Sequence, residues 1–162
     1  MTEEEVSLTK IRAAALALLT RRAYTAKELK TRLQKKGFPP EEIGGVISEF
    51  REKRYLDDYA YALVLAQDGL KRKGWARRRA DLALKEKGVG PAEREQVLNL
   101  VYSPTDEVKL ARDLMRKKWR RGLPPDPLKA RRQAAGYLAR RGFSAETIAQ
   151  VLRKPLSDEE EF

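Results

Sequence analysis

One short pattern occurs three times in this chain and predicts the end of one helix and the start of the next. It reads LQKKGFPPEEIGGVI from Leu33, LKEKGVGPAEREQVL from Leu84 and LARRGFSAETIAQVL from Leu138. In each copy a basic residue precedes a glycine and an apolar residue follows it. Glycine adopts the left-handed conformation that ends a helix, and the apolar residue after it can fold back on the last turn. The pattern therefore predicts three helix endings of one kind.

The spacing of the three glycines predicts a repeated helical unit. Gly37, Gly88 and Gly142 lie 51 and 54 residues apart, and apolar residues between them recur at helical spacing with no sustained strand pattern. We therefore predict an all-α fold of three tandem three-helix repeats, and a period of this size favours an extended array over the alternative of one globular core. The predicted boundaries are an acidic N-terminal tail at 1–7, repeats at 8–55, 56–102 and 103–154, and an acidic C-terminal tail at 155–162.

Residues at the predicted helix starts have the chemistry of helix caps. Thr25 and Glu28 have the spacing of a capping box, in which each side chain accepts a hydrogen bond from the backbone of the other residue. Asp57 or Asp58 is expected to cap the next helix, because no loop with further oxygen ligands accompanies this acidic pair. Later helix starts are predicted at Ser103–Pro104, Asp126–Pro127 and Ser144.

The composition argues against catalysis. The 162-residue chain contains no cysteine, which removes disulfides and thiol nucleophiles, and no histidine, which removes the commonest general base near neutral pH. It also lacks a glycine-rich phosphate loop. We expect a protein that is not an enzyme and that uses no cofactor or metal. No signal peptide or long apolar run is present, so a soluble, cytoplasmic protein is expected.

The distribution of charge predicts a polyanionic partner. The chain carries 35 basic and 24 acidic residues, for a net charge of +11. Seven of the acids lie at the two ends, outside all the basic residues, so residues 6–157 carry 35 bases against 17 acids, a net +18. A body this basic is typical of a protein that binds nucleic acid, a nucleoprotein assembly or an anionic surface. The alternative is a solvated charged surface in a heat-stable protein.

The basic residues form clusters, and two of these contain a tryptophan. KRKGWARRR spans 71–79 and RKKWRR spans 116–121. Cations beside an aromatic ring are typical of sequence-tolerant single-strand binding, whereas we favour packing as the role of Trp75 and Trp119. Paired basic residues also end three helices, where they complement the helix dipole. The candidate residues for binding DNA or a DNA-containing filament are Arg21, Arg22, Lys71, Arg72, Lys73, Arg77, Arg78, Arg79, Arg116, Lys117, Lys118, Arg120, Arg121, Arg140 and Arg141.

Several segments, taken in order, resemble the RecX family, bacterial regulators of the RecA recombinase. They are KELKTRLQKKGF, then YLDDYAYA from Tyr55, then a segment ending KEKGV, and finally YLARRGFS. The resemblance spans roughly residues 11–153. It implies a curved, all-helical molecule of three three-helix repeats that binds in the groove of a RecA–DNA filament. We expect the free protein to be a monomer. It also implies inhibition of ATP hydrolysis, strand exchange and filament growth, with no active site and no membrane.

Three features depart from the family pattern. Arg54 stands where a glycine commonly precedes the tyrosine of YLDD, and the lead-in to the middle repeat reads GWARRR, with Ala80 in place of a larger apolar residue.

The alternative function is a general DNA-binding protein with helix-turn-helix-like units and no recombinase partner. Both functions predict sequence-nonspecific, electrostatic contact with single- and double-stranded DNA.

Overall fold

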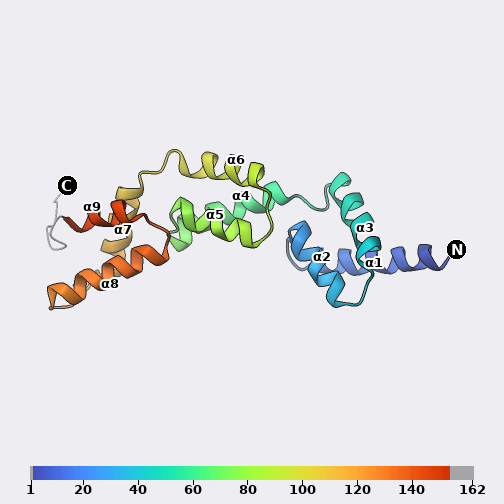
Figure 1. The fold of residues 1–162 in the computed structure, drawn as a ribbon, viewed down its shortest axis with the longest axis horizontal. Coiled ribbons are helices and arrows are strands. Elements are labelled where there is room, and N and C mark those ends of the chain that lie inside the picture. Colours follow the sequence, from blue (N-terminus) through green and yellow to red (C-terminus); the bar gives the residue numbers. More distant parts are fainter. Residues whose placement is uncertain (1, 154–162) are drawn as a thin grey trace. The chain divides into compact units, whose positions relative to one another are not determined.

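A computed structural model describes residues 2–153, and all regular structure in that range is helical, which confirms the all-α prediction (Figure 1). No helix of this part of the chain is both long and apolar enough to span a bilayer. The α-helices are α1 (Glu3–Leu19), α2 (Ala26–Lys35), α3 (Pro40–Glu52), α4 (Asp58–Asp68), α5 (Arg77–Glu86), α6 (Pro91–Tyr102), α7 (Glu107–Lys118), α8 (Pro127–Arg140) and α9 (Ala145–Arg153), and a π-helical turn, η1 (Gly69–Lys73), follows α4.

The chain divides into two compact units. The described residues 2–65 and 84–97 form the first unit, and residues 66–83 and 98–153 form the second. Helices α4, α5 and α6 therefore contribute residues to both units. Because this division passes through the middle repeat, the repeat boundaries drawn from the sequence stay a prediction.

The three glycine patterns end three helices in the same way. Each glycine has a positive φ, +90° at Gly37, +82° at Gly88 and +87° at Gly142. The N–H of the next residue donates to the carbonyl five residues earlier, joining Phe38 to Leu33, Val89 to Leu84 and Phe143 to Leu138 at 3.4, 3.1 and 3.3 Å. This is the Schellman ending, which satisfies carbonyls that the helix leaves free. The predicted helix endings are confirmed.

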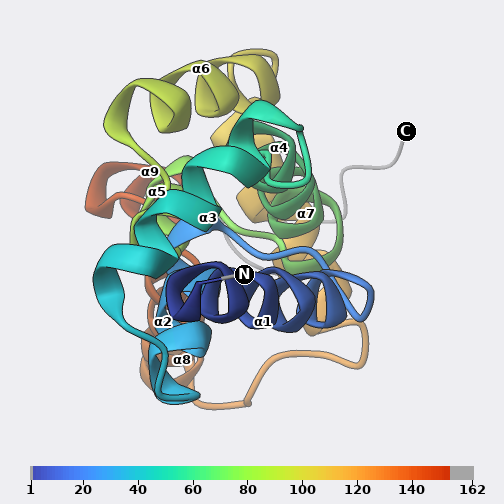
Figure 2. The same cartoon turned by 90° about the vertical axis from the view of Figure 1, so that its right-hand side faces the viewer.

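The three helices of the first repeat enclose an apolar core in the first unit. Helices α1, α2 and α3, blue to cyan in Figure 1 and Figure 2, pack against one another. Leu29 and Leu33 of α2 and Phe50 of α3 are almost completely buried. Burying a side chain of this size stabilises a fold by about 1.5–3 kcal/mol, so the apolar stripes read from the sequence supply this core. Its buried members are Ile11, Ala15, Tyr24, Ala26, Leu29, Leu33, Ile43, Val46, Ile47, Phe50 and Leu56.

The N-terminal acids do not form a separate tail, so that prediction for residues 1–7 is wrong. Helix α1 begins at Glu3, and Thr2 caps it through a capping box with Glu5. Three glutamates in the first turn complement the positive end of the helix dipole, which favours continuing the helix to this point. The predicted acidic tail at 155–162 lies outside the described residues.

A second core lies in the second unit, where α9 packs against both α7 and α8. It contains residues of all three helices together with Ala76, which precedes α5. Asp126 caps α8 with Pro127 in its first turn, and Ser144 caps α9, both as predicted. The start of α7 differs from the prediction, because Asp106 rather than Ser103 caps it. The buried members are Ala76, Ala111, Met115, Ala134, Leu138, Phe143, Val151 and Leu152.

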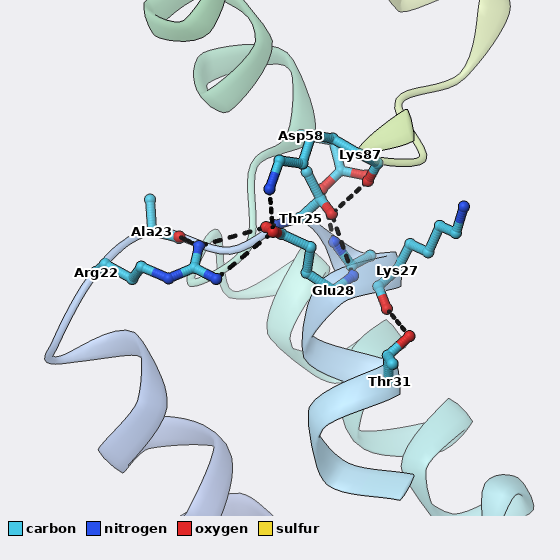
Figure 3. Close-up of polar contacts among 9 residues, drawn as sticks. Arg22, Ala23, Thr25, Lys27, Glu28, Thr31, Asp58 and Lys87 are labelled. Carbon is cyan, nitrogen blue, oxygen red and sulfur yellow. Dashed lines mark hydrogen bonds and ion pairs between the residues drawn. The ribbon is translucent and has the colours of Figure 1, made fainter. Parts of the chain in front are cut away.

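The two neighbouring aspartates are both helix caps, but they cap different helices. Asp57 Oδ1 accepts the N–H of Ala60 at 2.9 Å and so caps its own helix, α4. Asp58 Oδ1 accepts the N–H of Ala26 at 2.9 Å, at the start of α2 (Figure 3). The prediction of helix capping is therefore confirmed, and the second cap joins residues 32 positions apart.

Thr25 and Glu28 connect the start of α2 to the loop after α5, within the first unit. Their capping box is present as predicted. In addition, the Thr25 hydroxyl donates to the carbonyl of Lys87 at 2.6 Å, and Lys87 Nζ donates to Glu28 Oε1 at 2.7 Å (Figure 3). Burial alone would raise the pKa of Glu28, but the hydrogen bonds from Lys87, the Thr25 N–H and Arg22 outweigh it and lower that pKa. Burial is the main cause that raises the pKa of Asp58.

These opposite pKa shifts predict opposite pH dependences for two substitutions. Glu28 has a lowered pKa in the folded state, so its stabilising contribution is present above the unfolded-state pKa and is lost as pH falls through the folded-state value. We expect Glu28→Gln to lower the free energy of unfolding by about 1 kcal/mol at pH 7, through loss of charge-assisted hydrogen bonds, and to have little effect in acid. Urea denaturation of the wild type and of Glu28→Gln, repeated from neutral to acid pH, measures the difference between their free energies of unfolding.

Asp58 supplies the matched comparison. Its raised pKa means that the folded state binds the proton more tightly, so the ionised carboxylate lowers stability as pH rises through the folded-state value. Asp58→Asn keeps an oxygen acceptor for Ala26 and should become more stable than the wild type towards neutral pH. Asp58→Ala loses the cap and should cost about 1 kcal/mol. Parallel pH profiles for Glu28→Gln and Asp58→Asn would contradict this account.

Candidate nucleic-acid interface

The predicted cationic residues are distributed unevenly between the two units. Only Arg21 and Arg22 lie in the first unit, and all the others lie in the second. Arg22 is already engaged by neighbouring groups of its own unit. Its guanidinium lies 3.6 Å from the centre of the Tyr24 ring and donates to the carbonyl of Ala23 at 2.8 Å, and it lies within 3.5 Å of Glu28. The second unit is therefore the place to look for a shared cationic surface.

The first basic cluster surrounds a packed tryptophan. The π-helical turn ends at Gly74, which has a φ of +64°, and this turn places the Trp75 ring against Gly69. Lys73 Nζ lies 4.5 Å and Arg79 Cζ 4.6 Å from the centre of that ring. The backbone of Trp75 is also held, since its carbonyl accepts the hydroxyl of Tyr102 at 3.1 Å. Protein groups occupy the ring, so the structure favours packing over base stacking as its role.

The three arginines that follow Ala76 have different environments. Arg77 is held in place, because its N–H donates to Glu107 at 3.2 Å and its guanidinium donates to Asn99 at 2.8 Å. Arg78 is exposed to solvent, whereas Arg79 is half-buried beside Trp75. Of these three arginines, Arg78 is thus the one whose side chain is most available to an external ligand. The sequence alone does not separate these roles.

Ion pairs reduce the charge available at the start of the first cluster. Asp68 lies 3.2 Å from Arg72 and 3.5 Å from Lys73. Arg72 is 83% exposed, so its pair with Asp68 is screened and weak. Lys71 is exposed as well. This part of the cluster remains accessible to a polyanion that competes with Asp68.

The second basic cluster lies at the end of α7. Trp119 is the C-cap of this helix and packs edge-on against Tyr137 of α8, with ring centres 5.3 Å apart. A shallow, open hollow is lined by Asp113, Arg116, Lys117 and Arg120. Arg116 contacts Asp113 at 2.6 Å, but both side chains are more than half exposed, which makes this pair weak too. Lys117, Lys118, Arg120 and Arg121 are exposed.

The end of α8 joins these two clusters within the second unit. The Arg141 guanidinium lies 3.8 Å from the centre of the Tyr137 ring, and Lys118 Nζ lies 6.0 Å from the same ring. The carbonyl of Arg141 accepts the N–H of Ala76 at 2.8 Å, so the end of α8 lies directly beside the start of α5. The structure therefore brings together basic residues from 71–79, 116–121 and 140–141.

We call this region the cationic surface. It consists of Lys73 and Arg79 at the Trp75 ring, Lys118 and Arg141 at the Tyr137 ring, and the exposed neighbours Arg78 and Arg140. Tyr137 is the member that the sequence analysis missed. Its position four residues before Arg141 on a helix is the signal that could have found it, because side chains at this spacing lie side by side. Among residues 2–153, no cluster of acidic side chains has the composition of a metal site. The geometry suits electrostatic binding of a polyanion.

The fold and this surface together define a helical protein with a basic, aromatic-backed region in its second unit. The chain belongs to the RecX family of regulatory proteins. Residues 12–50 match the family model described as the first three-helix domain of RecX, and residues 105–152 match that of the third three-helix domain. This membership agrees with the resemblance seen in the ordered sequence segments.

Curated relatives extend the match over most of the chain. Regulatory protein RecX of Trichlorobacter lovleyi is 34% identical over 87% of this chain and 92% of its own length. Regulatory protein RecX of Chlorobaculum tepidum is 32% identical over 90% and 88%, and that of Streptomyces coelicolor is 35% identical over 93% and 79%.

Solved structures support the fold. The crystal structure of RecX from Lactobacillus salivarius superposes with a TM-score of 0.74, covering 92% of this chain and 96% of that one, at 18% identity. A second crystal structure, of regulatory protein RecX, gives a TM-score of 0.76 over 93% of this chain and 74% of that one, at 19% identity. At these identities the likeness concerns the fold.

Proposed function

We propose that this protein regulates the RecA recombinase, mainly as an inhibitor, by binding in the groove of the RecA–DNA filament. The observation that carries the proposal is membership of the RecX family over nearly the whole chain. The proposed effects are slower ATP hydrolysis, less strand exchange and restrained filament growth. In this role the protein acts by binding, as a monomer and without catalysis or a cofactor.

The cationic surface supports a polyanionic partner of this kind. A RecA–DNA filament carries nucleic-acid phosphates, and basic residues attract such a ligand over about 10 Å at ordinary salt. The three repeats proposed at 8–55, 56–102 and 103–154 give one chain several contact regions for neighbouring RecA protomers. Each added contact raises the free energy needed to rearrange or release those protomers.

One assay tests this function directly. RecA is assembled on single-stranded DNA, the protein is added, and ATP hydrolysis is followed. We expect inhibition at ratios well below one molecule per RecA protomer, because one bound molecule restrains a filament of many protomers. The same titration is repeated with extra DNA as the control.

The general DNA-binding alternative predicts a different outcome. A protein that only covers DNA inhibits near DNA-saturating amounts, and added DNA relieves the inhibition. That result would overturn a direct role at the filament. It would leave the cationic surface as a nonspecific DNA-binding region with electrostatic, salt-dependent affinity.

A further inference from the structure

Two contacts in the chain share one design, in which the turn that ends one helix meets the start of another, and we call each of them a joint. At the first joint, within the first unit, the turn after α5 meets the start of α2, and the carbonyl of Lys87 accepts the Thr25 hydroxyl at 2.6 Å (Figure 3). At the second joint, within the second unit, the turn after α8 meets the start of α5, and the carbonyl of Arg141 accepts the Ala76 N–H at 2.8 Å. Lys87 and Arg141 each precede a glycine of the repeated pattern, so the two joints are equivalent.

An acidic side chain holds the helix start at both joints. Asp58 Oδ1 accepts the N–H of Ala26 at 2.9 Å at the first joint, and Glu107 Oε1 accepts the N–H of Arg77 at 3.2 Å at the second. Each acid is the first residue of the next helix along the chain but one, α4 or α7. The two joints therefore match in their main contacts, and they differ in the charge of the side chains around them.

Opposite charges meet at the first joint, and like charges occupy the same positions at the second. Lys87 Nζ donates to Glu28 Oε1 at 2.7 Å. At the second joint the equivalent residues are Arg79, which lies 51 positions after Glu28, and Arg141. Neither arginine has an ion-pair partner among residues 2–153. Two cations repel each other, so the second joint has a repulsion where the first has an attraction.

The backbones of the second joint keep these cations close. A Cβ added at Gly142, the residue after Arg141, would lie 2.5 Å from the backbone nitrogen of Arg79 and 2.7 Å from its Cβ. Nη1 of Arg79 and Nε of Arg141 are shielded from solvent and have no hydrogen-bond partner in the described part of the chain. The buried Ala76 belongs to the core of the second unit and holds the joint together. The repulsion therefore changes how often the joint opens rather than whether it forms.

The charge of the surroundings increases the contrast. The described residues of the first unit include 15 basic and 13 acidic residues, a net charge of +2, whereas those of the second unit include 19 and 7, a net charge of +12. The cationic surface also takes residues from both sides of the second joint, because Arg78 lies at the start of α5 and Arg140 at the end of α8, and both are exposed.

We propose that the second joint opens readily in the free protein and that a nucleic-acid polyanion bound across it holds it closed, whereas the first joint stays closed without a ligand. Phosphates on both sides of the second joint neutralise charges that otherwise repel each other, so binding and closure favour each other. This inference deepens the proposed function and rests on it only in that a RecA–DNA filament presents such a polyanion. It is tested without RecA, so the two can fail separately.

The first measurement is amide hydrogen exchange of the free protein, followed by NMR at several salt concentrations. The N–H groups of Ala26 and Ala76 report on the first and the second joint, since each exchanges when its hydrogen bond opens. After correction for intrinsic rates, we expect Ala76 to exchange at least about tenfold faster than Ala26 at low salt. Added salt should slow exchange at Ala76 and not at Ala26, because it screens a repulsion at one joint and an attraction at the other. Parallel salt dependences would overturn the repulsion.

A charge reversal tests which residue causes the difference. Arg79→Glu gives the second joint the charge that Glu28 supplies at the first, and should slow exchange at Ala76 about tenfold and remove its salt dependence. Arg79→Met, which removes the charge and keeps a long side chain beside Trp75, should act in the same direction. The matched control Arg132→Glu makes the same charge change at an exposed position of α8 outside the cationic surface and should leave exchange at Ala76 unchanged. Unchanged exchange in both Arg79 variants would mean that water serves the shielded donors, and would overturn the proposal.

The last measurement adds oligothymidine at a saturating concentration and low salt. Exchange at Ala76 should become about tenfold slower in the wild type and change little in Arg79→Glu, whose joint is already closed, while Ala26 keeps its rate in both proteins. Equal slowing in the two proteins would show that the ligand only covers the joint, and faster exchange would show that binding opens it. Either result would overturn ligand-induced closure. Circular dichroism establishes that each variant is folded.

Discussion

Replacing Gly142 with alanine is expected to lower the free energy of unfolding by about 3 kcal/mol, combining strain of the left-handed backbone with overpacking. The φ of +87° disfavours any L side chain, and the added Cβ would meet backbone atoms of Arg79 at 2.5 and 3.0 Å. Backbone cannot rotate away as a side chain can, so the end of α8 must move from the start of α5.

The other two copies of the pattern provide internal controls. Gly37 has an equally positive φ but open space around it, so Gly37→Ala should cost only the conformational strain, about 1 kcal/mol. A Cβ at Gly88 would lie 2.6 Å from the Cβ of Lys27, which cannot rotate away, but the nearest atoms include no backbone atom of that residue. We therefore expect Gly88→Ala to lower the free energy of unfolding by an amount between those of Gly37→Ala and Gly142→Ala. Urea denaturation of the three variants measures how much unfolding free energy each one loses. A larger loss for Gly37→Ala than for Gly142→Ala would show that the contact with Arg79 does not matter.

Neutralising the basic residues at the end of α7 is expected to reduce the affinity for single-stranded DNA on the order of a hundredfold at moderate salt. In a plot of log affinity against log salt concentration, each phosphate contact makes the slope steeper by about 0.7, so lost contacts lower both the affinity and the slope. The variant changes five basic side chains to glutamine, and the slope itself should fall by about 2–3. Trp119 stays, so its packing against Tyr137 is retained. The five positions are Arg116, Lys117, Lys118, Arg120 and Arg121.

A control variant separates this local effect from the loss of net charge. It removes five exposed basic residues of the first unit and changes the total charge equally. We expect a much smaller change in the slope, measured with oligothymidine at several salt concentrations. Equal slopes for the two variants would show that binding follows total charge and that the end of α7 has no special role. The control positions are Lys10, Lys30, Arg32, Lys35 and Lys36.

Features set by a few consecutive residues could be predicted from the sequence. The Schellman endings depend on a glycine and the apolar residue after it, and the Thr25–Glu28 capping box depends on two residues three apart. The prediction of a separate tail for the N-terminal acids was wrong, because a run of glutamates is compatible both with a solvated tail and with the first turn of a helix. The capping box of Thr2 with Glu5 decided between them.

Features that depend on distant residues could not be predicted. Arg54 has a φ of 58°, so the backbone takes the left-handed conformation there with a residue that disfavours it. Nothing in KRKGWARRR distinguishes Arg77, which is held by Asn99 and Glu107, from Arg79, whose Nη1 has no hydrogen-bond partner among residues 2–153. These roles follow from contacts with α6, α7 and α8, which only the folded chain supplies.

The polar contacts at the start of α2 limit how freely the repeats can be exchanged between relatives. Besides its own Thr25–Glu28 capping box, helix α2 has Asp58 as acceptor for the N–H of Ala26 and Lys87 as ion-pair partner of Glu28. Asp58 and Lys87 both lie beyond the predicted 8–55 repeat that contains the helix. A chimera that transplants this segment alone leaves two partners behind and inherits whatever the recipient has at those positions. A graft of the first repeat should therefore fold well only when matching residues at positions 58 and 87 are transferred with it. The segment that must be exchanged together is longer than one repeat.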